Sequence, residues 1–296
     1  MFANYHTHTW RCHHASGTEN EYVETAIKGG LKILGFSDHT PYPFPEGVDT
    51  HAKMGMDELE GYVDTVLRLR DEYKADIEIH LGLEVEYLPP YFDELVKFTE
   101  QFPIEYFIMG QHYLNVEPDI HFVGSPFGDG MEEAHLKKYV DLCIEGLKTG
   151  KFTYLAHPDL FNFKGLPLGA ARAVQGMNTD DVGQGDVERT VSETDPVQNW
   201  EDALTEKERF FVSEMRRLCR YLHEADIPAE INFLGIWDHR HYPNPLFWKI
   251  AGEEHVKAIF GCDAHQPEKV WNPEAEKRAL AIVEENKLEL VEELKF

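Results

Sequence analysis

The sequence predicts an α/β barrel, in which parallel strands alternate with helices and carry functional groups at one end. Short apolar segments typical of buried strands alternate about seven times with amphipathic segments over the 296 residues. Histidine, glutamate or aspartate stands at the end of most of these apolar segments, which is where barrel enzymes place their catalytic groups. No glycine-rich phosphate loop follows a strand, and this disfavours an open nucleotide-binding sheet.

The first half of the chain contains four predicted strands, each followed by a helix. Thr18 and Glu21 have the spacing of a capping box, and Gly29 and Gly30 end the helix that they begin. The second helix has apolar residues three and four positions apart. We expect strands at residues 2–6, 32–39, 76–87 and 105–112, and helices at 18–30, 56–73, 90–101 and 131–150.

The second half repeats the pattern after one interruption. A polar, glycine-containing segment at about 164–202 is predicted to be a loop inserted after the fifth strand. It is either a lid over the site or a surface insertion with no chemical role. The whole chain, 1–296, is predicted to form a single domain. Strands are expected at 152–159, 228–233 and 256–265, and helices at 206–226 and 272–287, with a short apolar tail behind them.

The charge and composition of the chain disfavour some classes of binding partner. The formal net charge is −26, and nucleic acids and anionic membranes are bound chiefly through lysine and arginine. We therefore expect neither polymeric nucleic acid nor a membrane as partner. The sequence has no apolar run of about 18 residues that would span a bilayer, and its first residues lack the features of a secretory signal. Four scattered cysteines without a CxxC pair suggest a cytoplasmic protein with free thiols.

Histidine is unusually frequent, and its positions predict a metal site. There are 16 histidines. A single one would be interpreted as a hydrogen-bonded structural residue, but many imidazoles at strand ends would desolvate one another without a metal. Because side chains two apart on a strand point to the same face, paired donors converge. Imidazoles with carboxylates suit zinc, iron or manganese. The pairs are His6 and His8, Glu84 and Glu86, and Asp263 and His265.

Seven motifs together resemble a known superfamily. In order they are YHTHTWRCHHASG, GFSDHTP, GLEVEY, GQHYL, AHPDL, EIN and GCDAH. They resemble the motifs of the polymerase-and-histidinol-phosphatase (PHP) superfamily, and most of all its histidinol-phosphate phosphatase branch. The resemblance extends from about Ala3 to His265. It implies a distorted (β/α)7 TIM-like barrel with three divalent transition-metal ions (Zn, Fe or Mn) at the C-terminal ends of the strands.

The resemblance also implies which residues hold the ions. The third histidine of the family motif lies six residues beyond the second, so His14 is the expected ligand and His13 is not. Glu86 is expected to stand behind the ligands, because the family ligand directly follows "GL". One ion would be held by His6, His8, Glu84 and Asp263; Glu84 would bridge to a second ion held also by His112 and His157; a third would be held by His14, His39 and His265.

The function implied by the resemblance is metal-dependent hydrolysis of a phosphate monoester. The substrate would be a small phosphorylated metabolite, most simply histidinol phosphate of histidine biosynthesis. Asp263, Glu84 and His265 are the expected catalytic residues. Arg240, His241 and Lys53 are candidates for phosphate contact, with ordinary surface charge as the alternative. The chain departs from the family pattern around these contacts, because "FNFK" follows "HPDL" and Arg240 comes late after "EIN".

Two other functions remain open from the sequence. A PHP-type phosphodiesterase or nuclease would use the same metals on a small nucleotide or on nucleic acid, although the acidic charge and the lack of a basic, aromatic-rich segment disfavour a polymer. A non-catalytic metal-binding role is the other. Domains of this superfamily that lost activity typically lose ligands, whereas every expected ligand position is filled here. The sequence leaves the oligomeric state open.

Overall fold

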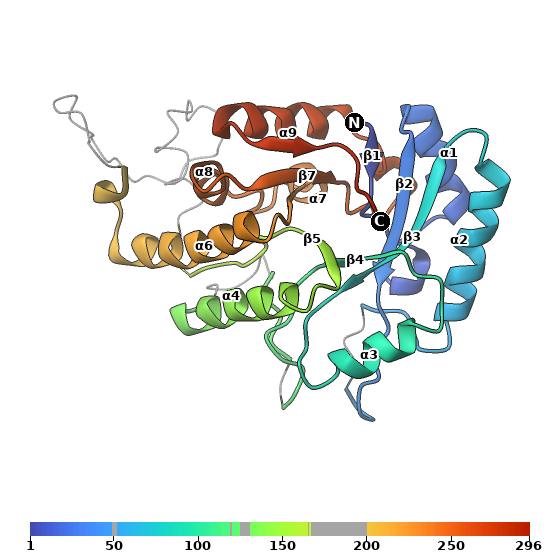
Figure 1. Cartoon of the computed structure of the whole chain (residues 1–296), viewed down its shortest axis with the longest axis horizontal. Helices are drawn as coiled ribbons and strands as arrows, with labels where there is room; N and C mark the ends of the chain where they lie inside the picture. Colours follow the sequence, from blue (N-terminus) through green and yellow to red (C-terminus); the bar gives the residue numbers. More distant parts are fainter. Residues whose placement is uncertain (49–51, 119, 125–130, 165, 167–199) are drawn as a thin grey trace.

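The computed structural model describes residues 1–48, 52–118, 120–124, 131–164, 166 and 200–296, and it contains one parallel β-sheet. The eight strands lie in sequence order (Figure 1). They are β1 Ala3–Asn4, β2 Ile33–His39, β3 Glu78–Val85, β4 Tyr106–Met109, β5 Phe152–Leu155, β6 Ala229–Asn232, β7 Lys257–Gly261 and β8 Glu289–Val291.

Helices surround the outside of the sheet (Figure 1). Those of the described residues are α1 Glu19–Gly29, α2 Leu59–Tyr73, α3 Phe92–Thr99, α4 Glu133–Leu147, α6 Glu206–Glu224, α7 Phe233–Trp237, α8 Pro245–Glu253 and α9 Pro273–Asn286, with short 3-10 turns η1 Trp10–Cys12, η2 Trp200–Ala203 and η3 Pro267–Lys269. The predicted capping box is confirmed, since Thr18 and Glu21 bond reciprocally and Gly30 ends α1 with a left-handed backbone.

The sheet curls until its first and seventh strands meet. Thr7 and Ala264 form a parallel bridge just beyond β1 and β7, and the backbone N–H of His8 donates to the carbonyl of Ala264 at 3.0 Å. The predicted barrel is thus confirmed as a curled, seven-stranded arrangement that closes at its carboxyl end. β8 pairs with β7 and was not predicted as a strand; the sequence prediction also missed α7 and α8.

The interior of the barrel is filled at its amino end. Tyr106 donates its hydroxyl to the carbonyls of Tyr5 and Phe36, at 2.8 and 3.1 Å. The C-terminal Phe296 ring stacks on Tyr106 with the ring centroids 5.0 Å apart. Apolar and tyrosine side chains occupy this end of the barrel, and the polar side chains converge at the opposite, carboxyl end. The buried interior cluster consists of Ala3, Tyr5, Ile33, Tyr106, Ile108, Tyr154, Ala156 and Ile259.

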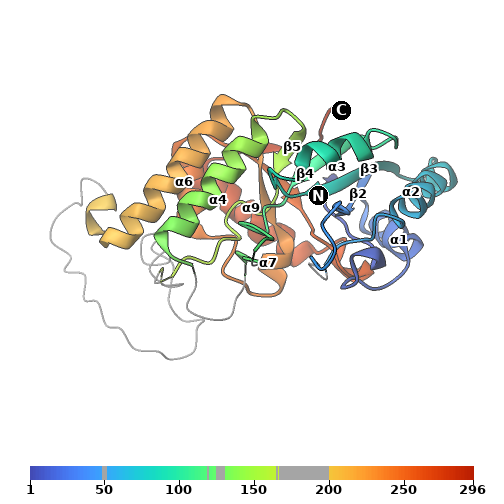
Figure 2. The same cartoon turned by 90° about the horizontal axis from the view of Figure 1, so that it is seen from below.

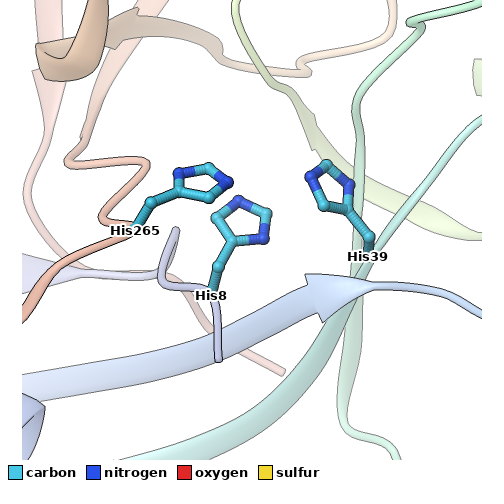
Figure 3. Close-up of side chains that lie close together, drawn as sticks. All are labelled: His8, His39 and His265. Atoms are coloured by element: carbon cyan, nitrogen blue, oxygen red, sulfur yellow. The ribbon is translucent and has the colours of Figure 1, made fainter. Parts of the chain in front are cut away.

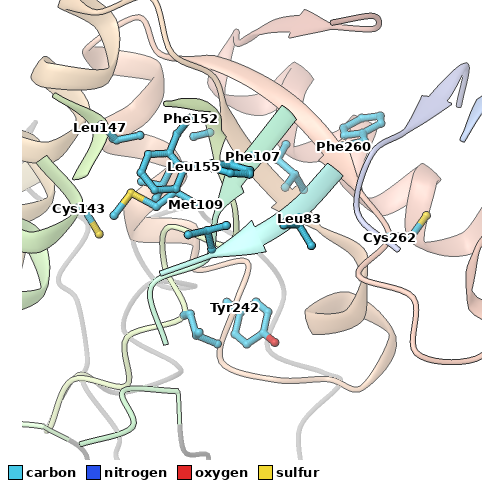
Figure 4. Close-up of a cluster of buried hydrophobic side chains, with 14 of the residues drawn as sticks. Leu83, Phe107, Met109, Cys143, Leu147, Phe152, Leu155, Tyr242, Phe260 and Cys262 are labelled. Carbon is cyan, nitrogen blue, oxygen red and sulfur yellow. The ribbon is translucent and has the colours of Figure 1, made fainter. Parts of the chain in front are cut away.

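A larger apolar core lies between the sheet and the helices. Met109 and Leu155 of β4 and β5 belong to the same buried cluster as Cys143 and Leu147 of α4, and Leu83 of β3 extends this cluster along the sheet (Figure 4). Burial of a side chain of this size contributes about 1.5–3 kcal/mol. In the view from below, α4 and α6 lie side by side (Figure 2) and pack against each other. This core holds the strand ends at fixed positions, which a multi-residue site requires.

The predicted insertion at 164–202 falls almost entirely outside the described residues. Near the end of this segment, Trp200 donates its indole N–H to Glu253 of α8 at 2.7 Å. Whether the segment acts as a lid stays a prediction. No helix among the described residues combines the length and the apolar character needed to cross a membrane.

Candidate metal centre

The nine side chains predicted as ligands form one cluster at the carboxyl end of the barrel. They come from β2, β3 and the loops that follow β1, β4, β5 and β7. Three of them, His8, His39 and His265, come from separate segments and gather in a small volume (Figure 3). The roles of the nine stay predictions, but the arrangement can be compared with the three predicted groups in turn.

Glu84 is at the centre of the cluster, near the end of β3. Its Oε2 lies 2.9 Å from His39 Nδ1, 3.5 Å from His6 Nε2 and 3.6 Å from His8 Nε2. Three imidazoles from the first two strands therefore face a single carboxylate oxygen. Glu84 is 1% exposed, so water does not screen these groups.

The other oxygen of Glu84 faces a different pair of histidines. Glu84 Oε1 lies 2.9 Å from His157 Nε2 and 3.4 Å from His112 Nε2. Gly110 makes room for the carboxylate, because a Cβ at that position would overlap Glu84 Oε1. His157 has a positive φ of 27°, a rare backbone conformation for a residue with a side chain and one that clusters at functional sites. Glu84 thus stands between two imidazole groups, as a bridging ligand would.

Asp263 completes the group predicted for the first ion. Its Oδ1 lies 3.0 Å from His8 Nε2 and 3.6 Å from His6 Nε2. Asp263, two residues after the end of β7, also has a positive φ, of 49°. The donor atoms of His6, His8 and Asp263 all lie within 4.8 Å of one another. One cation is able to contact all three.

The third predicted group lies at the outer side of the cluster. His14 Nε2 and His265 Nε2 are 2.8 Å apart, and the His8 and His265 rings stack with centroids 4.1 Å apart. Two ring nitrogens at this separation need a proton or a cation between them. His39, the third member, lies between His14 and Glu84, since its ring centroid is 5.2 Å from that of His14 and its Nδ1 is 2.9 Å from Glu84 Oε2. His13, by contrast, has a 53% exposed side chain, and its Nε2 is 3.7 Å from Glu58.

Glu230 orients two of the histidines and was not assigned a role from the sequence. Its Oε1 lies 2.7 Å from His6 Nδ1, and its Oε2 accepts the backbone N–H of His157 at 2.9 Å. A carboxylate on Nδ1 fixes the tautomer and leaves Nε2 free to coordinate. Gly261 makes room for it, because a Cβ there would overlap Glu230 Oε1. The feature of the sequence that could have pointed to Glu230 is a charged residue inside the buried strand "AEIN".

Two more carboxylates stand behind the cluster. Asp38 Oδ1 lies 3.3 Å from His8 Nδ1, and its Oδ2 accepts the hydroxyl of Thr9. Asp38 was also missed from the sequence, although it directly precedes His39. Glu86 Oε1 lies 2.8 Å from His112 Nδ1, in agreement with its expected place behind the ligands. Such partners raise the basicity of a ligand and hold its ring in place.

Glu230→Gln is expected to lower the metal affinity of the protein by about 10- to 100-fold, because the amide holds the His6 ring less firmly than a carboxylate. Equilibrium dialysis against a metal-ion buffer measures this. Glu72→Gln, on the exposed face of α2, is the matched control and should leave metal affinity unchanged. Equal affinities for the wild type and Glu230→Gln would show that this carboxylate does not support the site.

Several buried polar atoms at the centre lie near opposite charges but make no hydrogen bond of good geometry to the described residues. They are His6 Nε2, His8 Nε2, His39 Nδ1 and Glu84 Oε2. An unsatisfied buried polar group costs about 1–3 kcal/mol, so a cluster of four is unfavourable unless something binds there. All four point into the same small space, and their chemistry is that of ligands for a divalent cation. The residues therefore fit a metal centre.

The electrostatics of the cluster also favour cations. Burial alone would raise the pKa of Glu84, but the histidines around it, His112 foremost, hold that pKa well below its usual range. Asp263 behaves in the same way, with its pKa lowered by His6 and His8 against the effect of burial. Burial lowers the pKa of His39 and His265 well below the ordinary value. Against the lowering effect of burial, nearby carboxylates raise the pKa of His6 and His8. A metal binds the neutral imidazole, so its binding would displace protons from these two rings.

A pocket of about 380 Å³ opens from this cluster. Lys53, Arg240 and Lys269 contribute positive charge to its wall. Lys53 donates to both oxygens of Glu86, at 2.7 and 2.6 Å. His241 is not among the lining residues, and its Nε2 donates to the carbonyl of Leu160 at 2.7 Å. The geometry offers no support for a substrate contact by His241, which stays a prediction.

Fold and site together define a parallel α/β barrel with a histidine- and carboxylate-rich centre at the ends of its strands. Residues 4–187 match the model of the PHP domain family, and the chain belongs to that family.

Curated relatives in the family are named histidinol-phosphatases. The chain is 30% identical over 159 residues to a probable histidinol-phosphatase of Deinococcus radiodurans, covering 52% of this chain and 59% of that protein. It is 31% identical over 119 residues to the histidinol-phosphatase of Bacillus subtilis, covering 38% and 44%. The matches thus span about half the length of these relatives.

Solved structures extend the likeness to nearly the whole fold. A crystal structure of histidinol phosphate phosphatase from Lactococcus lactis, complexed with zinc, L-histidinol and phosphate, matches with a TM-score of 0.64 and 17% identity, covering 98% of this chain and 95% of that one. A putative histidinol phosphatase from Listeria monocytogenes matches with a TM-score of 0.61 and 18% identity, covering 93% and 99%. At this identity the likeness establishes the fold.

Proposed function

We propose that the protein is a metal-dependent phosphoric monoester hydrolase and that histidinol phosphate is its substrate. The observation that carries the proposal is Glu84, whose two oxygens face two separate groups of histidines. The names of the similar proteins supply the substrate, because the curated relatives and the L. lactis structure are histidinol phosphatases. A place in histidine biosynthesis follows from that substrate.

The proposed centre holds three divalent ions of zinc, iron or manganese. His6, His8, Asp263 and one oxygen of Glu84 would hold the first, and the L. lactis neighbour contains zinc. When bound, such ions neutralise charge on phosphoryl oxygens and lower the pKa of water. The chain needs this positive charge, since its own net charge is −26. The second would be held by the other oxygen of Glu84 with His112 and His157, and the third by His14, His39 and His265.

The chain's own residues would move the proton and bind the phosphate. Asp263 lines the pocket as an ionised carboxylate, and its Oδ2, which also accepts a hydrogen bond from Asn232 at 3.1 Å, is the proposed acceptor of the proton of the attacking water. Arg240 lines the same pocket and is the proposed contact to the phosphate. Lys53 also lines the pocket. Its ammonium group donates to Glu86, so its proposed contribution to phosphate binding is smaller.

The pocket favours a small substrate over a polymer. A volume of about 380 Å³ lies within the usual range of small-molecule sites. Its wall combines charged groups with apolar side chains such as Phe122 and Leu160, which suit a leaving group with a ring. The overall acidic charge opposes a nucleic-acid chain at the same site.

A substrate screen with metal-reconstituted protein tests the proposal. Histidinol phosphate should be hydrolysed with the highest kcat/KM, other phosphomonoesters more slowly, and a dinucleotide or bis-p-nitrophenyl phosphate hardly at all. Chelation should remove the activity, and the metal should restore it. A Glu84→Gln preparation purified in parallel controls for a contaminating phosphatase. Preference for either diester, or hydrolysis that survives complete removal of the metal, would overturn the proposal.

A further inference from the structure

A pair of cations on one wall of the pocket shares a single carboxylate. Asp238, which directly follows α7, accepts from Arg240 through Oδ2 at 3.0 Å and from Lys269 through Oδ1 at 3.1 Å. All three side chains line the pocket of the metal centre. Two positive charges against one negative charge leave this wall with one uncompensated positive charge.

Lys53, which also lines the pocket, leaves no uncompensated charge. Both oxygens of Glu86 accept from Lys53 Nζ, and this pair is buried, so its charges cancel locally. Asp263, the remaining lining carboxylate, is one of the predicted metal ligands. Outside the metal centre, the described lining residues therefore carry an excess of positive charge where Arg240 and Lys269 meet at Asp238. The chain as a whole repels anions, because its net charge is −26. A local excess of positive charge attracts an anion that enters the pocket.

Lys269 is held in place by the chain around it. It ends η3, and its backbone N–H donates to Gln266, the residue that follows His265, at 2.9 Å. Its side chain is only 15% exposed, and its ammonium group lies 5.9 Å from the centroid of the Trp237 ring. A lysine fixed in this way loses little further conformational freedom when it binds a ligand. The short turn also fixes its distance from the metal centre.

We propose that Lys269 binds the phosphoryl group together with Arg240, with Asp238 holding both cations ready. This inference rests on the proposed function, because it assigns the phosphate contacts of the same site. A monoester dianion carries more charge than a diester, so a wall with two cations favours the monoester. Lysine acts as a point charge, whereas the Arg240 guanidinium binds two oxygens at once. The sequence analysis did not single out Lys269, since it stands in an ordinary charged turn, "QPEKV".

Inorganic phosphate binding to the metal-loaded protein tests the assignment without turnover. Isothermal titration calorimetry should show a Kd about tenfold or more higher for Lys269→Gln than for the wild type, the scale of one charge-assisted hydrogen bond. Lys269→Arg, which keeps the charge, should stay within about threefold. Lys137→Gln removes a lysine that pairs with Asp141 on the exposed face of α4 and should change nothing. Metal content should be equal in all four proteins.

The outcomes separate this inference from the proposed function. If Lys269→Gln binds phosphate as tightly as the wild type, or if Lys269→Arg loses as much as Lys269→Gln, the assignment of Lys269 is wrong, whatever the substrate. If phosphate binding follows the charge at this position while histidinol phosphate is not hydrolysed, the assignment stands and the proposed substrate is wrong. Failure of the wild type to bind phosphate at all would overturn the inference.

Discussion

Glu84→Gln is expected to reduce kcat by about 10³-fold or more, the upper end of what one charge-stabilising group contributes. The two oxygens of Glu84 lie 3.5 Å from His6 Nε2 and 2.9 Å from His157 Nε2, which belong to the groups predicted for the first and second ions. An amide removes the negative charge and replaces one acceptor oxygen with a donor. Both neighbouring metal positions are therefore disturbed at once. Steady-state kinetics and elemental analysis on the same preparation measure the loss.

Glu86→Gln is the matched control for that experiment. Glu86 lies two residues further along the same chain segment and contacts His112 from behind, at 2.8 Å. We expect a loss of about 10- to 100-fold, with most of the metal retained. The neutral amide leaves the buried Lys53 ammonium without its charge partner, so the melting temperature should fall as well. Equal losses of metal and kcat in the two variants would mean that the bridging role of Glu84 is wrong.

The second large effect is expected at His14. His14→Ala should lower kcat by about 10²-fold or more, because the third ion would lose one of its three protein ligands, and with it charge that stabilises the phosphoryl group. Its Nε2 lies 2.8 Å from His265 Nε2, so the two rings are close enough to share the proposed third ion. Metal analysis should show one ion fewer than in the wild type. The ions beside Glu84 should remain.

His13→Ala is the neighbouring control. The His13 side chain is half exposed and faces Glu58, away from the other histidines. We expect an unchanged metal content and less than about a tenfold loss of kcat, the scale of an indirect effect. If His13→Ala loses the metal while His14→Ala keeps it, the assignment in this loop is wrong by one residue.

The sequence predicted that the nine candidate ligands lie together, because their positions follow from the strands. Parallel strands in a barrel end at the same rim, so His39 on β2 and Glu84 on β3 had to approach each other. The spacing of His6 and His8 then sends two imidazoles to that rim, and their ring centroids lie 5.1 Å apart. Convergence of this kind depends on strand order alone.

The residues behind the ligands were harder to predict, because their roles depend on contacts between distant segments. Glu230 reaches His6 across 224 positions of sequence. Its local sequence shows a charged residue within an apolar strand but does not show which side chain it contacts. The pairing of Lys53 with Glu86, and of Lys269 with Asp238, likewise depends on how loops pack over the rim. Sequence reasoning therefore identified a candidate for phosphate contact in Lys53 and passed over Lys269.

The elements missed in the fold have similar reasons. β8 has three residues, too few for a periodic pattern, and it is a strand because β7 offers it a free edge. α7 begins directly after β6 with Asn232 as its cap, so strand and helix run together in the sequence. Tertiary contacts decide such short elements, and local propensity does not.

Elemental analysis of protein purified without chelator tests the central claim, that the cluster around Glu84 is a metal centre. We expect two to three transition-metal ions per chain, because four buried polar atoms at its middle make no hydrogen bond to the described residues. The same analysis of Glu84→Gln should show fewer ions, and of Glu72→Gln the same number as the wild type. One ion or none in the wild-type protein would contradict the trinuclear assignment and the mechanism that depends on it.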